Sequence, residues 1–488
     1  MSAEEGRRLY GGWRRRRGMG LAGLGSAQSF VVVATVTVMA TAGAVSSTLL
    51  LVLLGPAVVV LALTVLRWDG LAVGARLVRR VRWSWGVMRD FTAYRSGLMA
   101  AHPHAWQLPG VLAPTDLLDV PTGRSESFGV VRDRRSGRLT ATLRVAASST
   151  WLAEPEQAEA WVANWGGWLS GLGYQPAVRW IAVTVRTGPT AGRRLAGYIS
   201  GRTAPGAPES ARRLLQHLVD DATGTDAEVE THVAVTVDPS RARPRPRTTE
   251  DALAETDRLL HGLEDSLGTC GLTVLGRATA PRLAATVRAA FDPSLPLDDL
   301  LSDGEPPDWG TAGPVAADEE YGCYRHDGGW SVSWAWHEAP RTEVYAEVLG
   351  RLLAPGPYPL RVSLIYRPVA AGDAARLVEQ EANAAVFRDA MRTVSRRDEN
   401  ARERADRTRA LRTAREEAAG AGVGLMSMFV TVTVTDRDAL AAAVADVEAR
   451  AESARIRLRR MWASQAVGFA VTLPCGICPP QLAAEWPR

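Results

Sequence analysis

Lysine is absent from this sequence of 488 residues, so all 57 of its basic residues are arginine. A P-loop places a lysine beside the phosphates of its nucleotide, and Schiff-base enzymes form their covalent bond through a lysine amine. The composition therefore excludes ordinary P-loop ATPases, lysine-dependent protein kinases and Schiff-base enzymes. We interpret the glycine-rich stretch GAGVG (420–424) as the end of a helix before a strand.

Cysteine is scarce, with four residues that are too few and too unevenly spaced for a disulfide framework: Cys270, Cys323, Cys475 and Cys478. This usage fits a reducing cytoplasm. The C-x-x-C pair in PCGICP (474–479) suggests a redox motif or half of a zinc site. However, Pro479 and Pro480 argue against a helix at that point, and a zinc site would need a second pair. We interpret the pair as loop cysteines, with redox and metal roles as alternatives.

Other catalytic signatures are also missing. The seven histidines have no ligand spacing, and we expect solvated positions for them, including His102, His104 and His337. There is no G-x-S-x-G elbow. Two tryptophan groups, one at 161–168 and one at 330–336, predict core packing, with a partner-binding face as the alternative. We therefore name no catalytic residue, no cofactor-binding residue and no metal ligand, and we expect a protein that is not an enzyme.

Charge is distributed unevenly along the chain. Residues 1–27 carry six Arg and two Glu, residues 28–66 carry no charge, and residues 67–95 carry seven Arg and two Asp. The net charge of +4 therefore comes from two short segments that flank an uncharged stretch. A general nucleic-acid binder would place positive charge on its folded body, so we expect no stable nucleic-acid binding.

The uncharged stretch contains two apolar runs, 28–44 and 47–66, each long enough to cross a hydrocarbon core of roughly 30 Å. Only Val45 and Ser46 separate them, which predicts a tight transmembrane hairpin. Arginine on both outer flanks predicts that both ends lie in the cytoplasm, by the positive-inside rule. We therefore expect a multi-pass protein of the cell (inner) membrane.

Residues 74–91 predict an amphipathic helix on the surface of anionic lipid. We expect these arginine and tryptophan residues to lie at the membrane interface: Trp13, Arg14, Arg15, Arg16, Arg17, Arg67, Trp68, Arg76, Arg79, Arg80, Arg82, Trp83 and Trp85.

Two alternatives remain for the apolar stretch. A signal peptide would have the same basic start and a small-residue site near ATAGA (40–44), but the arginines after the second run would then lie outside, against the charge rule. A buried core hairpin of a soluble protein would not place 39 uncharged residues between two arginine clusters.

Apolar periodicity predicts strands joined by helices in two successive sets, which is typical of an α+β body with two related lobes and one long charged helix, 372–418. Within the second set, AVGFAVTLP (466–474) predicts a closing strand. The expected organisation is a basic N-terminus (1–27), a transmembrane hairpin (28–66), a juxtamembrane amphipathic segment (67–95), a linker (96–126), a first lobe (127–292), a second linker (293–319), a second lobe (320–474) and a tail (475–488).

Three segments resemble a family of actinobacterial two-span membrane proteins of type IV-like, conjugation-type secretion systems: 108–121, 128–172 and 429–474. The body is also similar to the N-terminal region of the VirB-type traffic ATPase at THVAVTVD (231–238) and at the helix and strand over 252–278. In that motor the FAVTLP ending leads into the ATPase domain, whereas this sequence ends at Arg488. The resemblance thus implies a docking body without the motor.

The resemblance implies a non-enzymatic membrane scaffold that docks a separate ATPase at the inner face of the membrane, within a hetero-oligomer that includes lipid and other membrane subunits. The helix over 372–418 is the candidate contact surface, with a solvated structural helix as the alternative. A type VII (EccE-like) translocon component is the second hypothesis. A membrane-tethered enzyme with a site built from scattered Asp, Glu and His is the third.

Overall fold

The computed structural model describes residues 9–11, 26–68, 71–97, 107–122, 127–148, 153–189, 199, 202–204, 206–222, 227–302, 306–340, 342–380, 401–418 and 420–485. The chain forms two compact units. One contains residues 12–93 and 378–414, and the other contains residues 1–11, 94–377 and 415–488.

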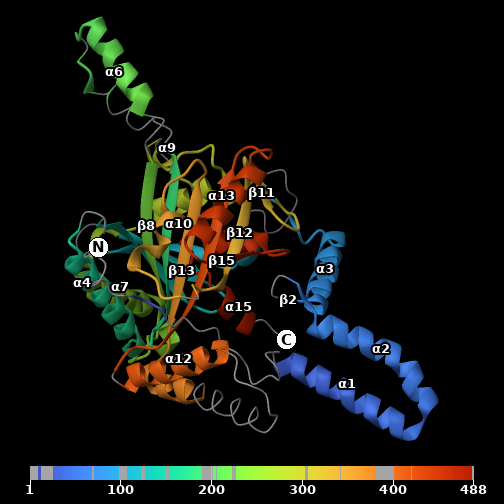
Figure 1. The fold of residues 1–488 in the computed structure, drawn as a ribbon. Coiled ribbons are helices and arrows are strands. Elements are labelled where there is room, and N and C mark those ends of the chain that lie inside the picture. The colour runs from blue at the N-terminus through green and yellow to red at the C-terminus, as the bar shows by residue number, and fades with distance from the viewer. Residues whose placement is uncertain are drawn as a thin grey trace, which may run out of the picture. The chain divides into compact units, whose positions relative to one another are not determined.

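The smaller unit contains the apolar hairpin (Figure 1). Helix α1 runs over Ser26–Val45 and helix α2 over Ser47–Val65, so only Ser46 separates them. Each is long and apolar enough to cross a membrane; 11% of the α1 window and none of the α2 window is buried inside the structure. A short ladder of β1 (Arg67–Trp68) and β2 (Leu71–Ala72) leads into α3 (Val73–Met88).

Threonine hydroxyls dilute the hydrophobicity of α1, but the helix itself satisfies them. Thr35 donates to the carbonyl of Val31 over 2.8 Å, and Thr37 donates to that of Val33 over 2.9 Å. In α2, Thr64 does the same to Val60 over 2.7 Å. Each hydroxyl therefore has an acceptor four residues earlier in its own helix, which lowers the cost of placing it in an apolar environment.

The larger unit is built on one antiparallel sheet, to which thirteen strands of the described chain belong. Its first-half strands are β4 (Thr115–Pro121), β5 (Ser127–Asp133), β6 (Leu139–Ala147), β7 (Val178–Pro189), β8 (Ala227–Val237) and β9 (Leu272–Arg277). Its second-half strands are β10 (Ala316–Glu319), β11 (Tyr324–His326), β12 (Gly329–Glu338), β13 (Leu360–Pro368), β14 (Gly424–Val434) and β15 (Arg457–Arg460), and β3 (Ala93–Arg95) adds an edge beside β10.

Both halves use the same strand order. Outward from the centre, the first half reads β7-β8-β6-β5-β4 with β9 also on β6, and the second reads β13-β14-β12-β11-β10 with β15 also on β12. The halves meet where β7 pairs with β13, from Thr187 opposite Leu360 to Ile181 opposite Tyr366. The repeat is therefore structural, but the predicted lobes are not separate bodies, because a continuous hydrogen-bonded ladder joins them.

Helices cover both faces of this sheet. One face packs α4 (Pro155–Gly171) and α7 (Thr249–Leu267) over the first half, and α10 (Gly350–Leu353) and α13 (Leu440–Ser453) over the second. The opposite face packs α8 (Ala280–Phe291) and α14 (Gln465–Val471), together with the segment that contains Cys475 and Cys478. The remaining elements are α6 (Glu209–Ala222), α9 (Leu297–Ser302), α12 (Ala401–Ala418), α15 (Pro479–Glu485) and the 3₁₀ turns η2 (Gly110–Leu112), η3 (Leu172–Tyr174), η4 (Pro239–Arg241), η5 (Gly268–Cys270) and η6 (Ala346–Leu349).

The antiparallel register sets which side chains share a face. Ile181 lies opposite Tyr366 and Val183 opposite Leu364, and these apolar residues face α4, α7 and α13. The alternate positions point to the α8 and α14 face, because side chains alternate along a strand. That second face contains polar residues as well as core residues, including the opposed pair Thr184 and Ser363, whose hydroxyls are 3.0 Å apart.

Three sequence predictions need correction. The expected linker 96–126 contains η2 and the edge strand β4, and the expected linker 293–319 contains α9 and the whole of β10. The expected closing strand over 466–474 is mainly helix α14, which buries residues on several sides of the helix. A short apolar run has no clear period, so its type cannot be told from periodicity alone.

The predicted charged helix 372–418 is described only in part. Residues 371–380 and Ala401–Ala418 are helical, while 381–400 lie outside the described residues.

Candidate functional site

The predicted membrane-interface residues have different outcomes. Trp13 and the four arginines at 14–17 lie outside the described residues. Arg67 and Trp68 form β1, where only the backbone is described. The remaining six, Arg76, Arg79, Arg80, Arg82, Trp83 and Trp85, all lie on α3.

Helix α3 separates apolar from basic residues. Its apolar stripe consists of Leu77, Val81, Trp85 and Met88, which follow one another at helical spacing and are 53%, 60%, 53% and 82% exposed. Arg76, Arg79 and Arg80 lie on the other side of the helix, where the Arg80 guanidinium is 5.1 Å from the ring of Trp83. The two tryptophans therefore differ: Trp85 extends the apolar stripe, while Trp83 lies among the arginines.

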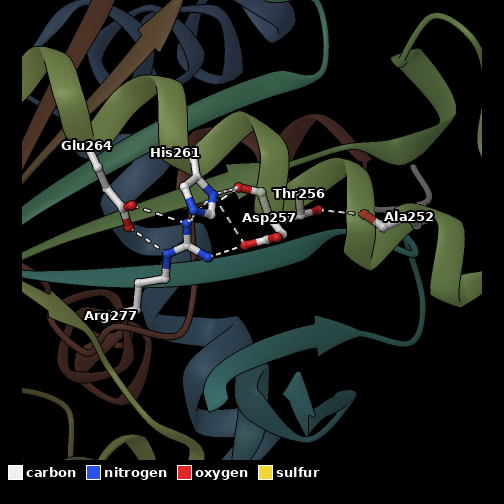
Figure 2. Close-up of polar contacts among 6 residues, drawn as sticks. All are labelled: Ala252, Thr256, Asp257, His261, Glu264 and Arg277. Atoms are coloured by element: carbon white, nitrogen blue, oxygen red, sulfur yellow. Dashed lines mark hydrogen bonds and ion pairs between the residues drawn. The ribbon is translucent and has the colours of Figure 1, made fainter. Parts of the chain in front are cut away.

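A dense ion-pair network joins β9 to α7. Figure 2 shows Arg277 of β9 between the carboxylates of Asp257 and Glu264 on the helix. Its Nε donates to Glu264 over 2.6 Å, and a terminal nitrogen lies 2.9 Å from Nδ1 of His261. Burial lowers the pKa of Arg277, but the two carboxylates outweigh burial and raise it. The positive charge of Arg277 is thus balanced by Asp257 and Glu264. We therefore assign this network a structural role, in which it holds β9 against α7.

Two histidines correct the expectation of solvated positions. His326 of β11 is fully buried: Nδ1 lies 2.6 Å from the carbonyl of Phe291 and Nε2 lies 2.8 Å from the hydroxyl of Ser331. Burial lowers its pKa to about 3, so the ring is neutral in the folded protein. His232 of β8 is 5% exposed and lies 3.3 Å from Glu230.

The buried imidazole predicts a pH-dependent stability. His326 takes up a proton in the unfolded chain below pH of about 6.5 but not in the folded chain until about 3, so its contribution is complete above 6.5 and is lost as the pH falls. Between pH 7.5 and 5.5 the free energy of unfolding should fall by about 1.4 kcal/mol more in the wild type than in His326→Gln. Urea unfolding of the full chain in detergent measures this, with the exposed His261→Gln as control. An equal pH dependence in wild type and His326→Gln would contradict the assignment.

The C-x-x-C pair lies in the hydrophobic core on the α8 and α14 face of the sheet. Cys475 and Cys478 are 4% and 1% exposed and are free thiols, and burial raises the pKa of Cys475 to about 12 and that of Cys478 above its usual value. Helix α15 begins at Pro479, which corrects the expectation that these prolines prevent a helix there; proline is tolerated at the first helical position. Buried, protonated thiols are poor nucleophiles, so the environment of Cys475 and Cys478 favours a packing role over a redox role.

The tryptophan groups pack mainly in the core, as the first interpretation predicts. Trp168 of α4 is buried, stacks on Trp165 with 5.0 Å between ring centroids, and donates to the hydroxyl of Ser266 over 3.0 Å. Trp334 of β12 is 1% exposed in the core beneath α13.

A cluster of five charged side chains lies on the α8 and α14 face and was not predicted from the sequence. Its members are Arg144 of β6, Arg186 of β7, Glu230 of β8, Arg282 of α8 and Arg361 of β13. The carboxylate of Glu230 is 2.9 Å from Arg282 and 3.6 Å from Arg186. Burial alone would raise the pKa of Glu230, but His232 and the two arginines outweigh it and lower the pKa.

One hollow of about 380 Å³, including its open mouth, lies between the end of α4 and residues 417–423. Its polar side chains are Ser170, Tyr174 and Glu417. Their arrangement indicates no particular reaction.

Among the described residues, no group of three or more His, Cys, Asp or Glu is placed to hold a metal ion. In comparisons with known proteins, no protein-family model and no curated protein matches this chain.

Proposed function

We propose that this protein is a non-enzymatic, integral membrane scaffold of a type IV-like secretion or conjugation apparatus, and that it docks a separate ATPase at the inner face of the membrane. The membrane part of the proposal rests on one observation: α2 is a helix of 19 residues with no charge and no buried residue. Exposure of an apolar surface of this size to water is unfavourable, and the hydrocarbon core of a bilayer would remove it from water.

Helix α3 supports the same placement. Its exposed apolar stripe and its arginines are typical of a helix that lies in the headgroup region of anionic lipid. Arginine before and after the hairpin supports a topology with both termini in the cytoplasm. A reporter fused to the C-terminus tests the topology: we expect fluorescence from a fused GFP and no activity from a fused alkaline phosphatase, and the reverse would contradict it.

The secretion role rests on the sequence resemblance over residues 108–121, 128–172 and 429–474. The proposed docking surface is the charged segment 372–418, whose described parts include the helix α12. A solvated structural helix remains the alternative for this segment.

The docking proposal is tested with the full chain in detergent micelles. We expect retention of a conjugation-type ATPase encoded beside this gene, and no retention when three exposed charged residues of α12, Arg412, Arg415 and Glu416, are reversed in charge. Retention of an FtsK-like ATPase instead would favour the type VII (EccE-like) alternative. Retention of neither would contradict docking, and charge reversal on the exposed face of α7 provides the matched control.

A further inference from the structure

The charged cluster around Glu230 contains more positive than negative charge. Strand register places Arg361 directly opposite Arg186, and Arg186 directly opposite Glu230. Arg144 lies opposite His232 on the neighbouring strand pair, and Arg282 reaches Glu230 from α8. Two guanidinium groups thus reach the carboxylate of Glu230, and those of Arg361 and Arg144 lie on the same face beside them. Glu228 is the other carboxylate on this face of β8.

The pairing of two arginines across a ladder is unfavourable. Like charges directly opposite one another destabilise a sheet. Burial, together with the charge of Arg186, lowers the pKa of Arg361 to about 9, and burial, together with the charge of Arg282, lowers that of Arg144. All of these groups still carry a full charge at neutral pH. Their repulsion is therefore present in the folded protein.

Several donors of the cluster are buried without an acceptor. The Nε atoms of Arg144 and Arg282 and one terminal nitrogen of Arg361 have no hydrogen-bond partner. Arg361 uses its Nε on the hydroxyl of Thr472 over 3.1 Å and stacks on Phe469 at 4.6 Å. An unsatisfied buried donor is costly, and a charged one more so. Arg277 provides a contrast in the same protein, because two carboxylates accept its hydrogen bonds.

A bound oxyanion would reduce the repulsion between the arginines and would accept hydrogen bonds from their unsatisfied donors. Counting Glu228 and Glu230 as ionised leaves a surplus of two positive charges, which equals the charge of a phosphate dianion. Guanidinium groups bind phosphate through paired hydrogen bonds, and a tetrahedral oxyanion accepts from several of them at once. The cluster is open to solvent on the side of Arg186, whose side chain is 32% exposed.

We infer that Arg144, Arg186, Arg282 and Arg361 form a binding site for a phosphate group. The phosphate can come from a soluble phosphate or from a lipid headgroup, and the chemistry at the site is the same. The inference does not depend on the proposed secretion role, because it rests only on the register and contacts of the sheet.

Isothermal titration of the full chain in detergent tests this site at constant ionic strength. The probes are orthophosphate, pyrophosphate and glycerol 3-phosphate, with acetate as a carboxylate probe. We expect saturable binding of the phosphates and at least tenfold weaker binding by Arg361→Met and by Arg144→Met. Tighter binding of glycerol 3-phosphate would identify a headgroup source, and tighter binding of pyrophosphate a soluble one.

The control variant is Arg132→Met on β5. Arg132 is paired with Asp116 through Nε at 3.0 Å and a terminal nitrogen at 2.5 Å, and its phosphate affinity should stay within twofold of wild type. Melting of the phosphate-free variants checks their fold: Arg144→Met should melt no lower than wild type, because it removes an unsatisfied cation. No saturable phosphate binding by the wild type, equal binding of acetate, or an equal loss in Arg132→Met would overturn the site.

Discussion

The double variant Leu54→Arg/Val58→Arg should lose membrane association almost completely. Both side chains lie near the middle of α2 and are 49% and 57% exposed. A single arginine at the centre of a spanning helix costs about 2.5–3.5 kcal/mol on insertion scales, so two cost roughly 5–7 kcal/mol if the effects add. We expect the share of full-length chain that floats with membranes in a density gradient to fall at least tenfold.

The control for this variant is Leu214→Arg/Leu218→Arg on α6, where two leucines are 62% and 55% exposed. It adds the same charge to an equally exposed helix outside the hairpin, and it should float as the wild type does. Flotation is the appropriate measurement, because aggregated protein sediments with membranes but does not float with them. If the α2 variant floats like the wild type, the hairpin is not the membrane anchor.

Truncation of Trp334 should cause the largest loss of stability in the larger unit. The side chain is 1% exposed, packs with α13 residues such as Val447, and its Nε1 donates to Glu448 over 3.3 Å. Removing a buried tryptophan side chain leaves a cavity that costs about 3–5 kcal/mol. We expect Trp334→Ala to lower the free energy of unfolding by this amount in urea titrations followed by circular dichroism.

Two further variants make the test specific. Tyr174→Ala removes an aromatic ring that is 70% exposed and should change stability by about 0.5 kcal/mol or less. Trp334→Phe keeps most of the volume but removes the donor to Glu448, so it should recover more than half of the loss. A Trp334→Ala protein as stable as Tyr174→Ala would show that the β12 core is not packed as described.

Local sequence patterns predicted much of the fold. The period-two pattern at 127–133 matches β5, and the apolar spacing over 280–291 matches α8. Failures occurred where local patterns are weak. The edge strand β4 lies in a segment rich in proline and glycine, and α14 is a seven-residue helix of mostly small apolar residues. In both cases long-range packing determines the structure, and a single sequence does not display it.

Whether a candidate site could be predicted also depended on how close its residues lie in the sequence. The arginines of α3 are close in sequence and fall within one helix, so their charge pattern predicted the segment. The phosphate-site residues come from positions 144, 186, 282 and 361, and only the pairing of β13 with β7 brings the two halves of the chain together there. One local signal was available: an arginine near the start of a largely apolar strand, as at Arg361.

The junction of β7 with β13 has a mechanical consequence. Seven residue pairs, from Thr187–Leu360 to Ile181–Tyr366, join the two halves in one continuous strand ladder. A force or a torque applied to one half is therefore transmitted to the other half through the β7–β13 pairing. Cutting the chain between the halves would also expose two long central strands as bare edges, which favours aggregation over independent folding.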